Sequence, residues 1–245
     1  MVKKMLKIVE KMTKNYSPNF DLNKRSLNSI KYLIFHYTGM KNDKLAIDKL
    51  TNPNSKVSCH YFIASDGKLI EMVPDLYTAW HAGKSRWKKD NFLNKKSIGI
   101  EISNPGHEHG YKDFNKKQIN SLIKISKYLI KKYNIKNTNI LGHSDIAPLR
   151  KLDPGEKFPW KKLAKVKIGI WHKISSIDCK KLRFKEIGKF EKEFLNDLIY
   201  LGYSSVYLKL NKSKVIKNFQ RRYRPEIING KIDQEMRKII KSLKY

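Results

Sequence analysis

Cysteine is nearly absent from this 245-residue sequence, which contains only Cys59 and Cys179. Two cysteines exclude a disulfide-stabilised scaffold and a metal site built from several thiolates, although one bridge between them stays open. No segment approaches the roughly 20 consecutive apolar residues that a membrane-spanning helix needs. We therefore expect no transmembrane segment.

The apolar core of a secretory signal is also missing. Residues 1–12 carry lysines but lack the run of about 7–15 apolar residues that such signals contain. Their apolar side chains recur at helical spacing, which predicts a short amphipathic helix followed by a polar loop to residue 29. The sequence as written favours the cytoplasm; the periplasm is the alternative if the true start lies upstream or export follows a non-standard route.

Acidic residues are scarce, with 22 Asp and Glu against 53 Lys and Arg and a formal net charge of +31. Such a charge is typical of nucleic-acid-binding proteins. However, only eight of the basic residues are arginine, the better fork for phosphates, and the lysines are spread from Lys3 to Lys244. We therefore expect no specific nucleic-acid partner, while attraction to anionic polymers in general stays open.

Hydrophobic residues make up 40% of the chain, which is enough for a real core. Strand-like apolar segments occupy residues 31–38, 60–73, 97–103 and 139–145, the second with a hairpin turn at Asp66-Gly67 and the last running into a loop. Helical spacing of apolar residues predicts a long helix over 115–133. Strands that alternate with helices predict an α/β domain that ends near residue 171.

The character of the sequence changes after that domain. A lysine-rich connection over 172–186 precedes three segments with helical spacing, at 190–203, 214–223 and 233–243. A small common core would consist of Leu195, Leu198, Ile199, Val215, Ile216, Phe219, Met236, Ile239 and Ile240. Because about 60 residues fold alone only marginally, we expect residues 187–245 to dock on the first domain.

Histidines at strand ends are the feature most informative about chemistry. His36 and His143 each end a predicted strand, and Asp153 follows in a proline-rich loop. Two imidazoles and a carboxylate match the three-ligand sets of catalytic zinc sites, although such histidines are more often structural groups. Glu101, opposite the isoleucines of its strand, either pairs with a lysine or faces a polar cleft. With Lys151 near Asp153, these are the parts needed for amide hydrolysis.

Five sequence blocks resemble the zinc-dependent N-acetylmuramoyl-L-alanine amidases of the type 2 family, which share a fold with peptidoglycan recognition proteins. The blocks are FHYTG (35–39), HYFIASDGKLIEMV (60–73), AWHAGKS (79–85), SIGIEISN (97–104) and GHSDIAPLRKLDPG (142–155). The resemblance covers roughly residues 30–165. It implies a mixed central β-sheet flanked by helices, with a catalytic domain over 30–171 after an N-terminal helix and loop over 1–29.

The resemblance also implies a role for each matched residue. The implied ligands of one Zn²⁺ per chain are His36, His143 and Asp153. Glu101 would be the general base that activates water, and Lys151 would stabilise the tetrahedral oxyanion. The implied substrate-binding residues are Trp80, His81, Asn104 and Tyr61.

The implied reaction is hydrolysis of the amide between N-acetylmuramic acid, or its 1,6-anhydro form, and L-alanine in peptidoglycan or muropeptides. The alternative is a non-catalytic peptidoglycan-binding protein of the same fold. Residues 215–240 are similar to a peptidoglycan-binding domain, so the three-helix unit over 187–245 is expected to bind the wall; the alternative is an appendage that only stabilises the catalytic domain. We expect a monomer whose partners are peptidoglycan or muropeptide fragments.

Overall fold

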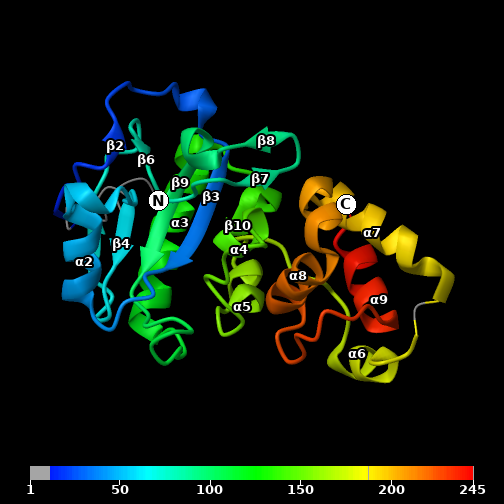
Figure 1. Ribbon diagram of the computed structural model, residues 1–245. Helices are drawn as coiled ribbons and strands as arrows, with labels where there is room; N and C mark the ends of the chain where they lie inside the picture. Colours follow the sequence, from blue (N-terminus) through cyan, green and yellow to red (C-terminus); the bar gives the residue numbers. More distant parts are fainter. Residues whose placement is uncertain (1–11, 187, 245) are drawn as a thin grey trace.

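The computed structural model describes residues 12–186 and 188–244, so the helix predicted over residues 1–12 lies almost wholly outside them. A six-stranded sheet with the order β1-β5-β4-β9-β3-β10 forms the centre of the first part (Figure 1). Its strands are β1 (Thr13–Lys14), β5 (Leu69–Glu71), β4 (Tyr61–Ile63), β9 (Ser97–Ile102), β3 (Tyr32–Tyr37) and β10 (Ile140–Gly142). Among the described strands of this sheet, only β4 and β5 pair antiparallel, which confirms the mixed sheet and the hairpin predicted over 60–73.

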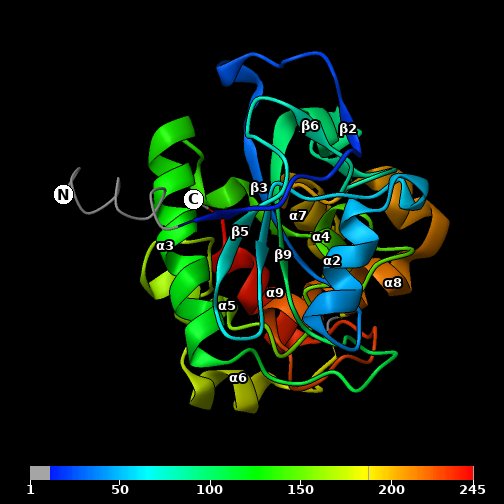
Figure 2. The ribbon, with the colours of Figure 1, turned by 90° about the vertical axis from the view of Figure 1, so that its left-hand side faces the viewer.

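Helices cover both faces of this sheet (Figure 2). Helix α3 (Lys116–Tyr133) lies along one face and confirms the helix predicted over 115–133; it begins with a capping box between Asn115 and Gln118. Helix α2 (Asp43–Thr51), which the sequence does not predict, packs on the other face near Phe62 of β4. Short elements complete this part: β2 (Phe20–Asp21), β6 (Thr78–Ala79), β7 (Arg86–Trp87), β8 (Asp90–Asn91), α4 (His143–Ile146) and α5 (Trp160–Lys165).

Alternation along β3 and β9 decides which side chains reach each face. Leu33 and Phe35 pack under α3 together with the isoleucines of β9, as the pattern over 97–103 predicts. Ile34 points to the other face, and His36 follows it there. Because parallel pairing sets His36 directly opposite Glu101, both polar side chains lie on this second face.

Four helices form the C-terminal part: α6 (Ser176–Leu182), α7 (Glu191–Leu201), α8 (Ser205–Tyr223) and α9 (Gln234–Ser242). Helix α6 lies inside the segment that the sequence predicts as a connection, and α8 starts nine residues before the predicted helix, with a kink at Asn211. Ile199 of the predicted core is 44% exposed, and Phe194 is buried instead. In the described part of the chain, no helix is long and apolar enough to cross a membrane.

The C-terminal helices share one hydrophobic core with the second face of the sheet, beside β10 and α4 (Figure 1). The predicted docking is therefore confirmed. Gly202, with φ of +134°, ends α7 against Trp87, and a Cβ there would come within 2.3 Å of the indole ring. The backbone N–H of Lys88 donates to the carbonyl of Gly202 (2.8 Å), so a backbone hydrogen bond also joins the two parts.

Candidate active site

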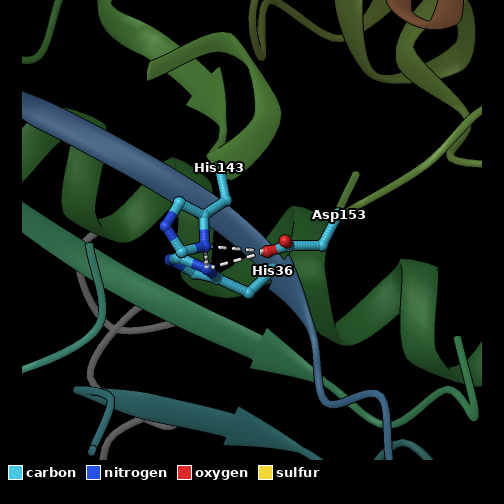
Figure 3. A group of neighbouring side chains, drawn as sticks. All are labelled: His36, His143 and Asp153. Carbon is cyan, nitrogen blue, oxygen red and sulfur yellow. Dashed lines mark hydrogen bonds and ion pairs between the residues drawn. The ribbon is translucent and has the colours of Figure 1, made fainter. Parts of the chain in front are cut away.

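Three side chains from separate elements converge on the second face of the sheet (Figure 3). His36 comes from β3, His143 from the first residue of α4, and Asp153 from the loop that precedes α5. The Nδ1 atom of His36 lies 3.0 Å from Nδ1 of His143 and 3.0 Å from Oδ2 of Asp153, and Nδ1 of His143 lies 3.1 Å from the same oxygen. All three residues are buried. The strand predicted over 139–145 thus ends at Gly142, and His143 opens a one-turn helix instead of ending that strand.

The far nitrogen of His143 identifies its tautomer. Nε2 lies 3.2 Å from the carbonyl oxygen of Ala82, which can only accept a hydrogen bond. Nη2 of Arg150 also lies 3.3 Å from this nitrogen, but its two N–H groups donate to the carbonyls of Ala82 and Lys84. We therefore assign the proton of the neutral tautomer to Nε2, which leaves a lone pair on Nδ1.

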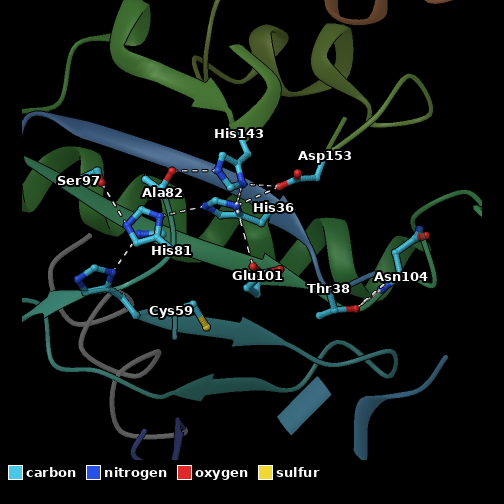
Figure 4. Close-up of polar contacts among 12 residues, drawn as sticks. His36, Thr38, Cys59, His81, Ala82, Ser97, Glu101, Asn104, His143 and Asp153 are labelled. Atoms are coloured by element: carbon cyan, nitrogen blue, oxygen red, sulfur yellow. Dashed lines mark hydrogen bonds and ion pairs between the residues drawn. The ribbon is translucent and has the colours of Figure 1, made fainter. Parts of the chain in front are cut away.

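A chain of hydrogen bonds fixes His36 in the same way (Figure 4). The hydroxyl of Ser97 donates to the carbonyl of Leu93 (2.7 Å), so its oxygen accepts from Nε2 of His81 (3.2 Å). Nδ1 of His81 then accepts from Nε2 of His36 (3.0 Å). His36 therefore also directs an Nδ1 lone pair at Asp153.

Two lone pairs and a carboxylate oxygen that meet within 3.1 Å suit a bound cation. Burial lowers the pKa of His36 to about 4, helped by the nearby His143, so the imidazole is neutral at pH 7. Burial opposes the ionisation of Asp153, but His143 and His36 outweigh it and hold the pKa of Asp153 far below its usual range. Within residues 12–186 and 188–244, this is the one group of three such side chains that could hold a metal.

Glu101 lies beside this group, with Oε1 4.0 Å from Nδ1 of His36. Burial raises the pKa of Glu101 well above its usual range; Asp153 raises it further, and Lys151 opposes the shift. The buried Oε2 has no hydrogen-bond partner among the described residues. An unpaired carboxylate oxygen at this position can bind a water molecule and take its proton.

The site opens into a cleft of about 400 Å³. Three cationic side chains line it: Lys49, Arg150 and Lys151. Trp80 also lines it and is held by a hydrogen bond from Nε1 to Asp21 (2.8 Å). These cations form a basic wall beside the carboxylates of Glu101, Glu108 and Asp153, and Trp80 adds an aromatic surface. The basic wall suits a substrate that carries carboxylates, and the indole ring suits a sugar.

Two other residues predicted to bind substrate, His81 and Asn104, make hydrogen bonds within the protein. His81 reaches the cleft, but its ring is held between His36 and Ser97, which favours the orientation of His36 over contact with substrate. The side-chain amide of Asn104 donates to the carbonyl of Lys112 (2.7 Å) and accepts from the backbone of Gly106 (3.1 Å). Asn104 therefore closes the loop beside the cleft.

Tyr61 is not in the cleft, so the sequence-based prediction for this residue is corrected. Pairing of β4 with β9 sets Tyr61 opposite Ile100, and its side chain therefore points to the face covered by α3. Its hydroxyl donates to Asp75 (2.6 Å). The prediction considered proximity in sequence but not the register of β4, which decides the face.

Sequence reasoning missed the support behind His81. A Cβ at Gly99 would lie 2.4 Å from the His81 ring, so only glycine leaves room for the imidazole against β9. The backbone N–H of Gly99 donates to Nδ1 of His60 (3.0 Å), and Arg25 approaches Nε2 of His60 (2.8 Å). A glycine inside an apolar strand was the available signal, since it marks a close approach.

A set of donors that suits a cation, with a proton acceptor beside it, can activate water against an unreactive bond, so the fold and the site define a hydrolase. A family model for N-acetylmuramoyl-L-alanine amidases matches residues 26–156. The chain belongs to this family, whose members are zinc-dependent, and it is therefore an amidase that hydrolyses the bond between N-acetylmuramic acid and L-alanine.

Known relatives agree with this membership. The amidase AmiD of Escherichia coli K12 is 34% identical over 234 residues, which cover 87% of this chain and 82% of AmiD. Its structure in complex with an anhydro-N-acetylmuramic acid tripeptide has a TM-score of 0.77, 32% identity and 91% coverage of each chain. AmpDh3 of Pseudomonas aeruginosa, in complex with an anhydromuramic pentapeptide, has a TM-score of 0.76 and 28% identity, and the match covers 92% of this chain and 95% of AmpDh3. The 1,6-anhydro-N-acetylmuramyl-L-alanine amidase AmpD of E. coli is 39% identical over 105 residues, 43% of this chain and 55% of AmpD.

Proposed function

We propose that this chain releases stem peptides from muropeptides with one Zn²⁺ bound by His36, His143 and Asp153. The observation that carries the proposal is the convergence of their three donor atoms within 3.1 Å, with both far imidazole nitrogens already paired. A zinc ion held by these residues would supply Lewis acidity, which polarises a carbonyl and makes water more acidic.

Two further side chains would complete the reaction. Glu101 would accept a proton from the attacking water at its unpaired Oε2 and deliver it to the leaving nitrogen. Lys151 lines the cleft beside Asp153 and would stabilise negative charge on the carbonyl oxygen. Trp80 would contact the substrate from the cleft wall.

The basic wall of the cleft supports a substrate that carries carboxylates, as stem peptides do. Structures of AmiD and AmpDh3 contain anhydromuramic peptides, and on this basis we propose 1,6-anhydro muropeptides as substrates of this chain, beside those with reducing sugars. The C-terminal helices would add a peptidoglycan-binding unit over residues 187–245, behind a catalytic domain over 30–171 and a connection over 172–186 that contains α6.

Mass spectrometry of purified muropeptides tests this function. Both anhydro and reducing forms are incubated with zinc-loaded protein, chelator-stripped protein and the Asp153→Ala variant, with exposed Asp113→Ala as the matched control. We expect free stem peptide with zinc-loaded wild type and Asp113→Ala alone, and loss of bound zinc from Asp153→Ala. No release by zinc-loaded wild type, or full zinc occupancy in Asp153→Ala, would refute the proposal.

A further inference from the structure

Asp145 lies two residues after His143 and is itself buried, at 2% exposure. Its Oδ2 accepts a hydrogen bond from the backbone N–H of Gly142 (2.8 Å), the residue that precedes α4. The carboxylate therefore closes the single turn that starts with His143. Any group that holds Asp145 also determines where the His143 ring is presented.

The C-terminal part supplies the groups that hold Asp145. Arg222 of α8 donates from Nη1 to Oδ2 of Asp145 in a buried ion pair, and from Nη2 to the carbonyl of Ile140 in β10 (3.0 Å). Tyr203, which precedes α8, donates to Oδ1 of Asp145 (2.9 Å). The guanidinium also lies 4.0 Å from the centroid of the Trp160 ring.

The side chains that hold Asp145 are buried, so the loss of one of them cannot easily be compensated by water. Arg222 is 4% exposed and Tyr203 is 1% exposed. A buried ion pair contributes little net stability, but loss of one partner leaves an uncompensated charge that must move or find water. The loss of Arg222 would therefore displace Asp145, and with it the turn that carries His143.

Helix α8 also binds the segment that carries Asp153, on both sides of that residue. Three of its side chains, spaced along one side of the helix, donate to that segment: Lys214 to the carbonyl of Leu149 (3.1 Å), Asn218 to the carbonyl of Pro148 (2.9 Å) and Arg221 to Glu156 (3.3 Å). The same loop carries Lys151. Helix α8 thus contacts the chain both before and after Lys151 and Asp153.

We propose that α8 and Tyr203 position the metal site, with Arg222 and Tyr203 acting on His143 through Asp145. The inference rests on the proposed metal ligands. Neither Arg222 nor Tyr203 touches the donor atoms of His36 or Asp153, so each is a positioning residue and not a catalytic one. Loss of such outer partners typically lowers metal affinity or activity about 10–100-fold.

Arg222→Lys tests the proposal, with Arg224→Lys as a matched control. Lysine keeps the positive charge but has a single donor nitrogen, so it cannot reproduce the guanidinium fork that uses Nη1 for Asp145 and Nη2 for Ile140. Arg224 is also buried (1% exposed), but it pairs with Asp233 and Glu235 inside the C-terminal part. Zinc affinity is measured by competition with a chromogenic chelator, and the absorption spectrum of the Co²⁺-substituted protein reports the geometry of the site.

We expect Arg222→Lys to bind zinc about tenfold more weakly with a changed Co²⁺ spectrum, and Arg224→Lys to match wild type in both despite any loss of stability. Unchanged zinc affinity in Arg222→Lys, or an equal loss in Arg224→Lys, would overturn the inference.

Tyr203→Phe is a second test of the proposal, for the case that Arg222→Lys does not fold. This change removes the hydrogen bond to Asp145 and retains the ring that packs on Trp87. We expect a several-fold loss of zinc affinity, and wild-type affinity would count against the role of Tyr203. Wild-type protein that binds no zinc would overturn the proposed function itself, so the two failures are distinguishable.

Discussion

Proton positions around single residues decide what the site can bind. The hydrogen-bond chain from His36 through His81 to Ser97 ends at a backbone carbonyl, which can only accept. Each proton in the chain therefore points away from the cluster of donors. The arrangement orients His36, and burial lowers its pKa so that the ring is neutral at pH 7, which is the state that a metal ligand needs.

Glu101→Gln separates proton transfer from metal binding. Glutamine has nearly the same shape but cannot accept the proton of the attacking water. We expect zinc content equal to wild type and a turnover lower by about two to four orders of magnitude, the usual size of a general-base contribution. The measurement pairs metal analysis with release of stem peptide; a turnover close to wild type would mean that another group takes the proton.

Asp75 predicts how stability depends on pH. Burial opposes its ionisation, but hydrogen bonds from Lys132, Tyr133 and Tyr61 outweigh it and hold the pKa of Asp75 below its usual range. A pKa lowered by folding stabilises the protein above the unfolded-state pKa, about 3.9, and this contribution is lost as pH falls through the folded-state value.

Asp75→Asn should therefore lower the free energy of unfolding at pH 7 by about 1–3 kcal/mol. The difference from wild type should shrink as the pH falls below about 4, because protonated Asp75 is also uncharged. Urea unfolding of both proteins from pH 7 downwards measures it. A difference that stays constant over this range would show that the charge of Asp75 does not stabilise the fold.

At the scale of elements, the spacing of apolar residues predicted the helices and strands that bury one regular face. The apolar runs of β3 and β9 and the helical spacing of α3 gave the right structure, since each buries one regular face. Helix α6 was missed because its polar, lysine-containing sequence is stabilised by distant partners: Arg183, at its end, pairs with Glu235 of α9 (2.8 Å). Contacts between elements leave little trace in local composition.

In the site, too, local motifs could be predicted from the sequence, and contacts between distant segments could not. Motifs pointed to His36, His143, Asp153 and Glu101, which the structure brings together. The support from Arg222 could not be predicted, because it depends on α8 packing against Asp145 of α4, 77 residues earlier in the chain. The face on which Tyr61 lies depended on strand register, which a single short strand does not specify.

Gly99→Ala tests the support of His81 by β9. The added methyl group would lie 2.4 Å from the His81 ring, so the imidazole or the strand must move. We expect a loss of about 1–3 kcal/mol in stability, as for other overpacked sites, together with weaker zinc binding.

Gly110→Ala is a suitable comparison, because a Cβ there meets nothing within 4 Å, although its φ of +89° adds a small backbone cost. Thermal unfolding and zinc affinity are measured for both variants. Zinc affinity unchanged in Gly99→Ala would show that His36 does not need His81 in its present place.

At the scale of the whole molecule, the sheet and the C-terminal helices pack together through a shared hydrophobic core. A single hydrophobic core joins β3 to the C-terminal helices, and α8 reaches the loop that carries Lys151 and Asp153. The match to AmiD also extends over 91% of both chains and is not confined to the catalytic part. Three of the 53 basic side chains, Lys49, Arg150 and Lys151, line the cleft, where they can attract substrate carboxylates.

The most direct test of the central claim is stem-peptide release measured against bound zinc. Chelator-stripped protein receives zinc in steps, and the rate of release from an anhydro muropeptide is recorded with the zinc bound per chain. We predict that stripped protein is inactive and that the rate rises in proportion to bound zinc up to one ion per chain. Release by zinc-free protein, or a rate that does not follow zinc, would contradict the account.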